Sequence, residues 1–242
     1  MKILGIESSG LVASVAVVED DVMIGEYTMN YKKTHSQTLL PMLDELGQMI
    51  ELDLNTIDAI AVAGGPGSFT GLRIGSATAK GLGLALDKPI ISVPTVDGLA
   101  FNMWGSSNLV CPIMDARRNQ TYTGLYSFSN DGMEIVEVQC AVDISEIIDK
   151  INEIGRAVTF LGDGVPVFRD YIKEHCEVPY VYAPAHMNKQ RAGALAAIGI
   201  EYMKAGQMEK AEDHRPDYLR LSQAERERLE KEKLEKERSV TE

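Results

Sequence analysis

Along the first 100 residues, short apolar segments alternate with polar turn sequences and with two longer segments of helical periodicity. The short segments have the length of strands, and the longer ones place apolar side chains three or four positions apart. Pro41 lies inside the first helical segment and predicts a kink or a delayed start. The predicted order is strand, strand, strand, helix, strand, helix, strand, at residues 2–6, 12–18, 22–30, 35–50, 57–63, 70–86 and 89–93.

The second half of the chain repeats this order, although few residue identities repeat. Strands are expected at residues 109–114, 120–128, 135–142 and 157–161, and helices at residues 144–154 and 166–174. Each half has an acidic residue directly after its first strand, Glu7 in one and Asp115 in the other. This parallel predicts two copies of one βββαβα unit. A further helix is expected at residues 187–205, packed between or across the halves.

The pattern predicts two lobes, at residues 1–100 and 101–220, followed by a charged tail at residues 221–242. The tail begins with a capping-box sequence, Ser222 with Glu225, so a solvated helix is expected at least at its start. Its few apolar residues are too sparse for a coiled coil.

The expected fold class is α/β, with the duplicated halves of the actin, sugar kinase and heat-shock ATPase superfamily, which is ribonuclease H-like. In that fold, the turn after each first strand holds nucleotide phosphates, and paired carboxylates hold magnesium through water. The candidate residues for such a site are Glu7, Ser8, Ser9 and Asp115. The alternative is that Glu7 and Asp115 only cap turns, and the neighbouring Arg117 and Arg118 favour an ion-paired Asp115.

The glycine-rich segment at residues 64–75 predicts a tight loop that enters a helix. It lacks the lysine and hydroxyl of a P-loop, and its glycine spacing differs by one residue from a dinucleotide-binding loop. Small residues then recur at every fourth position, at Gly71, Gly75, Ala79 and Gly83. Because a helical glycine costs about 1 kcal/mol relative to alanine, this repeat predicts close approach by another element, from this chain or another.

Composition restricts the partners and the compartment. The 242 residues carry a net charge of −12, which disfavours nucleic acid and anionic membranes as main partners. Three widely spaced cysteines indicate reduced thiols, and Glu7 interrupts the N-terminal apolar run before a signal peptide is complete. No apolar run approaches the length of a membrane span. A cytoplasmic protein is therefore expected.

Four motifs occur in order over residues 1 to about 220: the segment at residues 64–75, Asp-Ala-Arg-Arg at 115–118, Gly-Asp-Gly at 162–164, and Pro-Asp-Tyr-Leu-Arg at 216–220. Together they resemble the TsaB (YeaZ) family, bacterial subunits of the machinery that makes N6-threonylcarbamoyladenosine at position 37 of tRNA. One departure is Glu7, where the family more often has aspartate, and this weakens a phosphate-binding role at the first turn.

The resemblance implies a paralogue of the catalytic subunit TsaD, which binds its metal through an H-x-E-x-H sequence. The two histidine places fall on Thr95 and Leu99, and neither side chain ligates metal as histidine does. The four histidines of the chain offer no close pair. We therefore expect no metal site, no catalytic residue and no cofactor of its own.

The function implied is a non-catalytic scaffold that binds and activates TsaD, with TsaE joining the assembly, and that forms a homodimer when TsaD is absent. The two N-terminal helices would supply half of a helix bundle, and the expected contact residues are Leu39, Leu43, Leu46, Ile50, Gly71, Leu72, Gly75 and Ala79. ATP or ADP has a place only at the junction of the complex, tRNA would be contacted indirectly, and no membrane is involved.

Three alternatives stay open. Both N-terminal helices would be only the core of their own lobe if no partner docks on them. A nucleotide-hydrolysing enzyme would use Glu7 and Asp115, and a metallopeptidase would need a metal site elsewhere.

Overall fold

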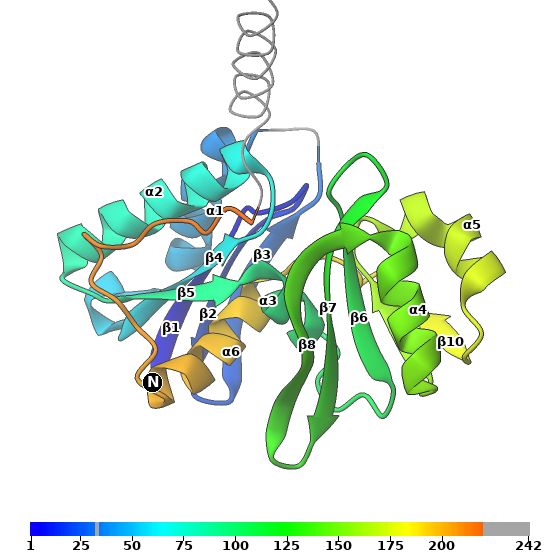
Figure 1. Cartoon of the computed structure of the whole chain (residues 1–242). Helices are drawn as coiled ribbons and strands as arrows, with labels where there is room; N and C mark the ends of the chain where they lie inside the picture. Colours follow the sequence, from blue (N-terminus) through cyan, green and yellow to red (C-terminus); the bar gives the residue numbers. More distant parts are fainter. Residues whose placement is uncertain (32–33, 220–242) are drawn as a thin grey trace, which may run out of the picture.

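The computed structural model describes residues 1–31 and 34–219, so the predicted tail helix and its capping box lie outside the described residues. Two five-stranded mixed sheets lie side by side, one in each half of the molecule (Figure 1). The strand orders are β3-β2-β1-β4-β5 and β10-β9-β6-β7-β8. In both sheets the first three strands in sequence are antiparallel neighbours and the last two join in parallel, which confirms the predicted fold class.

The first sheet has a helical layer on each face. Its strands are β1 (Lys2–Glu7), β2 (Ala13–Glu19), β3 (Val22–Met29), β4 (Ala59–Gly65) and β5 (Ile90–Pro94). Helices α1 (His35–Met49) and α2 (Phe69–Leu86) share one buried apolar cluster with it, and a 3-10 turn, η1 (Leu54–Thr56), leads into β4. Helices α3 (Thr95–Phe101) and α6 (Ala192–Lys204) pack on the opposite side.

The second sheet is built from β6 (Leu109–Asp115), β7 (Gln120–Ser129), β8 (Gly132–Asp143), β9 (Val158–Leu161) and β10 (Tyr180–Tyr182). Helices α4 (Ile144–Ile154) and α5 (Val165–His175) form one buried apolar cluster with this sheet. An Asp143 capping box with Glu146 starts α4, and Gly155 ends it in the left-handed region.

Three local predictions differ from the structure. Helix α1 begins at His35 and runs through Pro41, so the start is not delayed. The short helix α3 follows β5, where the sequence pattern predicted no helix. Helix α6 begins at Ala192, not at residue 187, and in the segment before it the carbonyl oxygens of Met187 and Lys189 accept hydrogen bonds from the Asn102 side chain.

The chain returns to the first sheet at its described end. Helix α6 buries its apolar face there, and Glu209 pairs with Ile90 at the edge of β5. Residues 205–219, which we call the C-terminal strap, then run beside α2 (Figure 1), and Lys80 donates hydrogen bonds to two strap carbonyl oxygens. The predicted second lobe, residues 101–220, therefore includes segments that pack on the first sheet.

No helix within the described ranges combines the length and the apolar character needed to cross a bilayer. All three cysteines are free thiols.

Candidate functional site

The turn after β1 packs directly against the start of α2. Ser8 Oγ donates a 2.9 Å hydrogen bond to Gly71 O, and Ser68 N donates a 2.6 Å bond to Ser9 O. A Cβ atom at Gly67 would clash with the carbonyl oxygen of Ser9, and one at Gly71 with that of Ser8. The α2 glycines thus serve close approach within this chain, and the start of α2 covers the predicted phosphate-binding turn.

Glu7 is turned into the protein. Its side chain is buried, and Oε1 accepts hydrogen bonds from Ser9 N (2.6 Å) and Ser9 Oγ (2.5 Å). Burial raises the pKa of Glu7 to about 7, against the lowering effect of the Ser9 hydrogen bonds. These contacts are those of a carboxyl group that caps its own turn.

Asp115 occupies the matching position in the second half, in a more open setting. It accepts a 2.8 Å hydrogen bond from Arg117 N and lies 3.4 Å from the Arg117 guanidinium. Arg117, Arg118 and Asn119 all have left-handed backbone conformations, with φ values of 66°, 58° and 60°. The structure therefore supports the ion-paired Asp115 that the neighbouring arginines favoured.

A cleft of about 460 Å³ opens between the two halves. Its walls come from the β1–β2 turn, the start of α2, the β6–β7 turn, the loop after β9 and the end of the C-terminal strap; they include Ser9, Leu11, Phe69, Asp115, Asp163 and Tyr218. Of the four candidate nucleotide residues, Ser9 and Asp115 line this cleft. Glu7 and Ser8 do not.

Two features of the cleft did not emerge from the sequence. Asp163 belongs to the Gly-Asp-Gly motif; its Oδ1 has no hydrogen-bond partner, and burial raises its pKa. On the other wall, the Tyr218 ring lies 4.6 Å from the Phe69 ring, and the Arg73 guanidinium carbon lies 4.0 Å from the Phe69 ring centre. Asp163 and this aromatic pair lie in motifs noted in the sequence, but the sequence did not indicate that these motifs line one cavity.

The two places that correspond to metal-binding histidines are part of the protein core. Thr95 and Leu99 are buried in α3. Between them, Asp97 accepts hydrogen bonds from Tyr126 Oη (2.6 Å) and Tyr202 Oη (2.8 Å), and burial raises its pKa. Asp97 thus joins α3, β7 and α6. Residues 1–31 and 34–219 contain no cluster of three or more His, Cys, Asp or Glu side chains arranged to hold a metal ion.

The residues predicted to contact a partner are mostly buried within the chain itself. Gly71 and Gly75 face Ser8, Ile50 is partly buried, and the other five belong to the buried core; these are Leu39, Leu43, Leu46, Leu72 and Ala79. Helical periodicity thus identified a stripe that has contacts within the chain, and contact of these residues with a partner stays a prediction.

The outward faces of the same helices carry a different apolar set. Leu40 is 55% exposed, Met49 73% and Leu84 60%, and Gly81 has open space around it. A groove of about 510 Å³ is lined by α1, by the segment that follows α1 and by Leu82 of α2; Leu40, Leu43, Leu52, Asp44 and Glu51 are among its other lining residues.

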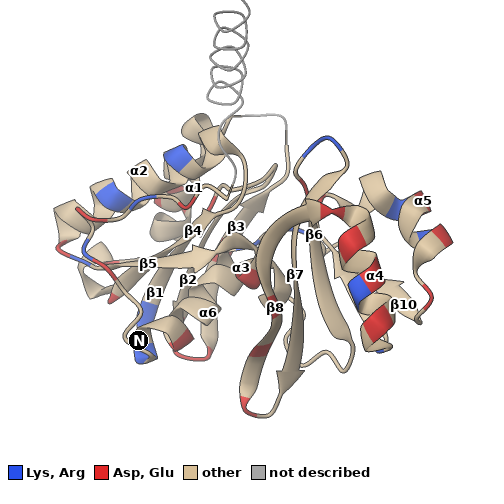
Figure 2. Ribbon diagram, in the orientation of Figure 1, with Lys and Arg blue, Asp and Glu red and all other residues tan. Residues whose placement is uncertain are grey.

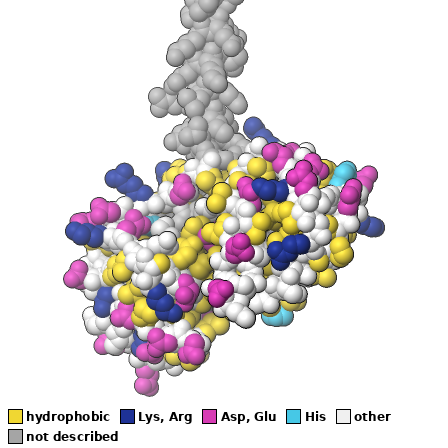
Figure 3. Space-filling view, turned by 60° about the horizontal axis from the view of Figure 1, so that its bottom comes forward, with side chains coloured by type: hydrophobic (Ala, Val, Ile, Leu, Met, Phe, Trp, Pro, Cys, Tyr) yellow, Lys and Arg dark blue, Asp and Glu magenta, His cyan; other side chains and the backbone are white. Residues whose placement is uncertain are grey.

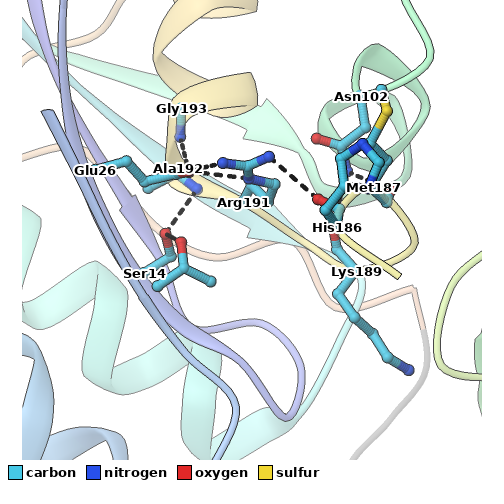
Figure 4. Close-up of polar contacts among 10 residues, drawn as sticks. Ser14, Glu26, Asn102, His186, Met187, Lys189, Arg191, Ala192 and Gly193 are labelled. Atoms are coloured by element: carbon cyan, nitrogen blue, oxygen red, sulfur yellow. Dashed lines mark hydrogen bonds and ion pairs between the residues drawn. The ribbon is translucent and has the colours of Figure 1, made fainter. Parts of the chain in front are cut away.

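A polar network joins the two halves near the start of α6 (Figure 4). Arg191 pairs with Glu26 of β3, which also accepts a 2.9 Å hydrogen bond from Gly193 N. The Asn102 amide donates to the carbonyl oxygens of Met187 (3.2 Å) and Lys189 (2.7 Å). The two connections between the halves are therefore tied to each other and to the first sheet.

Comparison with known proteins gives consistent results. The family model for TsaD, tRNA N6-adenosine threonylcarbamoyltransferase, matches residues 23–228. A Bacillus subtilis protein named tRNA threonylcarbamoyladenosine biosynthesis protein TsaB is 35% identical, over 93% of this chain and 96% of its own length. A Pseudomonas aeruginosa crystal structure, described as similar to peptidase YeaZ, superposes with a TM-score of 0.78 at 25% identity, over 90% of this chain and 99% of that one.

The similarity in fold extends further. The activator of 2-hydroxyisocaproyl-CoA dehydratase from Clostridium difficile, solved with bound ADPNP, superposes with a TM-score of 0.50 at 10% identity. It covers 86% of this chain and 97% of its own. At this identity the comparison shows a shared fold and nothing about ligands.

Proposed function

The chain belongs to the TsaB family of tRNA threonylcarbamoyladenosine biosynthesis proteins, and from this premise we propose that it is a non-catalytic subunit that binds and activates TsaD. A role in threonylcarbamoyladenosine biosynthesis follows from family membership. The observation that supports binding to TsaD is the exposed apolar face of α1 and α2. The expected lack of catalysis rests on Thr95 and Leu99, which stand where TsaD would have its metal-binding histidines.

The outward face of α1 and α2 has the character of a protein contact surface. The exposed Leu40 lines a groove, Met49 and Leu84 are exposed elsewhere on the two helices, and the exposed small residues Ala77 and Gly81 leave room for another helix to approach α2 closely. Each large apolar side chain contributes about 1.5–3 kcal/mol if it becomes fully buried. Asp44 and Glu51 on one side of the face, and Arg73 and Lys80 of α2, supply charges of both signs for partner choice.

The alternative of an ATP-hydrolysing enzyme has less support. It needs the turn after β1 to hold phosphates and Glu7 to face a magnesium ion. Ser68 and Gly67 cover that turn, and Glu7 is hydrogen-bonded to Ser9.

The proposed partners are TsaD, TsaE and, without TsaD, a second copy of this chain through the same helices. The threonylcarbamoyl-adenylate substrate would come from another enzyme. ATP or ADP at the junction with the partners stays a prediction, as does the absence of a cofactor held by this chain alone.

Charge introduced on the exposed face tests the proposal. Leu40→Glu and Leu84→Glu should abolish co-elution with TsaD in size-exclusion chromatography while the melting temperature stays near that of the unchanged protein. Val167→Glu is the matched control, because Val167 of α5 is 59% exposed; this variant should co-elute normally. Unchanged co-elution of the Leu40 and Leu84 variants would refute docking through α1 and α2. Substitution of the buried Gly75 or Leu43 would test folding instead.

A further inference from the structure

We propose that the cleft between the two halves binds one unpaired nucleotide of an RNA, with the base inside and the phosphate at the arginine-bearing β6–β7 turn. The choice of RNA as ligand rests on the proposed function in tRNA modification.

The rim presents positive charge from a turn that is held in place. Arg117 lines the cleft with a side chain that is 86% exposed, and Arg118 beside it is also exposed. Three consecutive left-handed residues other than glycine cost about 1–2 kcal/mol each. The turn keeps this conformation because Asp115 accepts from Arg117 N, and Asn119 O accepts from Ile144 N at 3.3 Å. The backbone of the turn thus places both arginines together, and guanidinium groups suit phosphate oxygens.

The opposite wall presents aromatic surface. Phe69 and Tyr218 lie 4.6 Å apart and both line the cleft, as does Tyr122 from β7. Arg73 covers the Phe69 ring and adds another positive charge at this end of α2. Aromatic rings beside arginines form the usual platform for unpaired bases, and stacking contributes about 1–3 kcal/mol per base.

One lining residue of the cleft carries a hydrogen-bond acceptor without a partner. Asp163 lines the cleft, its Oδ1 atom is buried and has no hydrogen-bond partner, and a carboxyl oxygen can accept hydrogen bonds from the amino groups of bases. Arg117 pairs with Asp115, so these two charges offset each other, and Arg118 adds a further positive charge to the same turn. A volume of about 460 Å³ falls within the range of small-ligand pockets.

The overall negative charge of the molecule restricts the expected contact with RNA to this cleft. Figure 2 shows basic residues in the β6–β7 loop and on α2, the two sides of the cleft, whereas the face in Figure 3 mixes acidic and basic side chains. With a net charge of −12, the chain alone should bind RNA weakly. The site would therefore hold one nucleotide of an RNA that partner proteins also bind.

The test uses the full chain mixed with TsaD and a fluorescent RNA hairpin with an unpaired loop, measured by anisotropy. Arg117→Gln/Arg118→Gln should raise Kd at least tenfold and reduce the salt slope by about 0.7, because the one phosphate placed at this turn contributes about 0.7 to the slope for a single strand. Arg156→Gln/Lys173→Gln removes the same charge from exposed positions elsewhere and should stay within twofold. Tyr218→Leu should weaken binding without changing the salt slope.

Three results would overturn the inference. The Arg117/Arg118 variant and its control could bind the hairpin with equal affinity, or a fully paired RNA could bind as tightly as the hairpin. The third is displacement of the hairpin by an equal concentration of ATP. Co-elution with TsaD is recorded for every variant. Failure of the unchanged chain to co-elute counts against the proposed function, whereas a loss of RNA specificity with intact co-elution counts only against the cleft.

Discussion

The carbonyl oxygen of Ser8 lies where a side chain at Gly71 would extend, and the Ser8 hydroxyl donates a hydrogen bond back to Gly71 O. The first turn of the chain and the start of α2 are thereby held in direct backbone contact. This contact explains why Gly71 and Gly75 face inward, and it leaves the outward side of the helix for a partner.

Gly71→Ala should destabilise the protein by about 2 kcal/mol or more, because the new Cβ meets backbone that cannot move aside without disturbing β1. Gly81→Ala is the matched control in the same helix, since no atom lies within 4 Å of its Cβ position. It should stabilise the protein by up to about 1 kcal/mol. Urea unfolding monitored by circular dichroism measures both values; equal effects would show that the Ser8 contact carries no stability.

Glu7→Gln should change how stability depends on pH. The folded protein holds the Glu7 proton up to a pKa of about 7, above the usual 4.5, so the unchanged protein loses stability as pH rises between these values. The full loss is about 3 kcal/mol, at 1.36 kcal/mol per pH unit. Glutamine keeps an acceptor for Ser9 and carries no proton to lose.

The variant should therefore be more stable than the unchanged protein above pH 7, and the difference should shrink toward pH 4.5. Unfolding free energies measured at half-unit pH steps test this. Parallel curves for the two proteins would show that the Glu7 pKa is not raised.

Arg191→Met should destabilise the protein by about 2 kcal/mol, because it leaves the Glu26 carboxylate, 7% exposed, without its cation. Adding Glu26→Gln should recover part of this loss, since glutamine still accepts from Gly193 N. Lys204→Met breaks an ion pair of two exposed groups and should cost less than about 0.5 kcal/mol. A double-mutant cycle with zero coupling between Arg191 and Glu26 would contradict the network in Figure 4.

The sequence allowed the fold to be predicted because each half repeats the same order of periodic segments. The order of periodic segments is a local pattern, which survives in a single sequence. The loss of metal ligands at Thr95 and Leu99 was inferred from the family resemblance and stays a prediction.

Contacts between distant segments were not predictable in the same way. Periodicity shows that Gly71, Gly75 and Ala79 share one helical side, but it does not show whether that side meets Ser8 or another protein. The cleft between the two halves and the return of the C-terminal strap to α2 also join segments far apart in sequence. Only the folded structure reveals these contacts.

The most direct test of the central claim is tRNA modification in a reconstituted mixture of this chain, TsaD, TsaE, ATP, threonylcarbamoyl-adenylate and an unmodified tRNA. Threonylcarbamoyladenosine is quantified by mass spectrometry with each protein omitted in turn. The account predicts full product only when this chain and TsaD are both present, and none when TsaD is left out. Product formed by this chain without TsaD, or an unchanged yield when this chain is omitted, would contradict it.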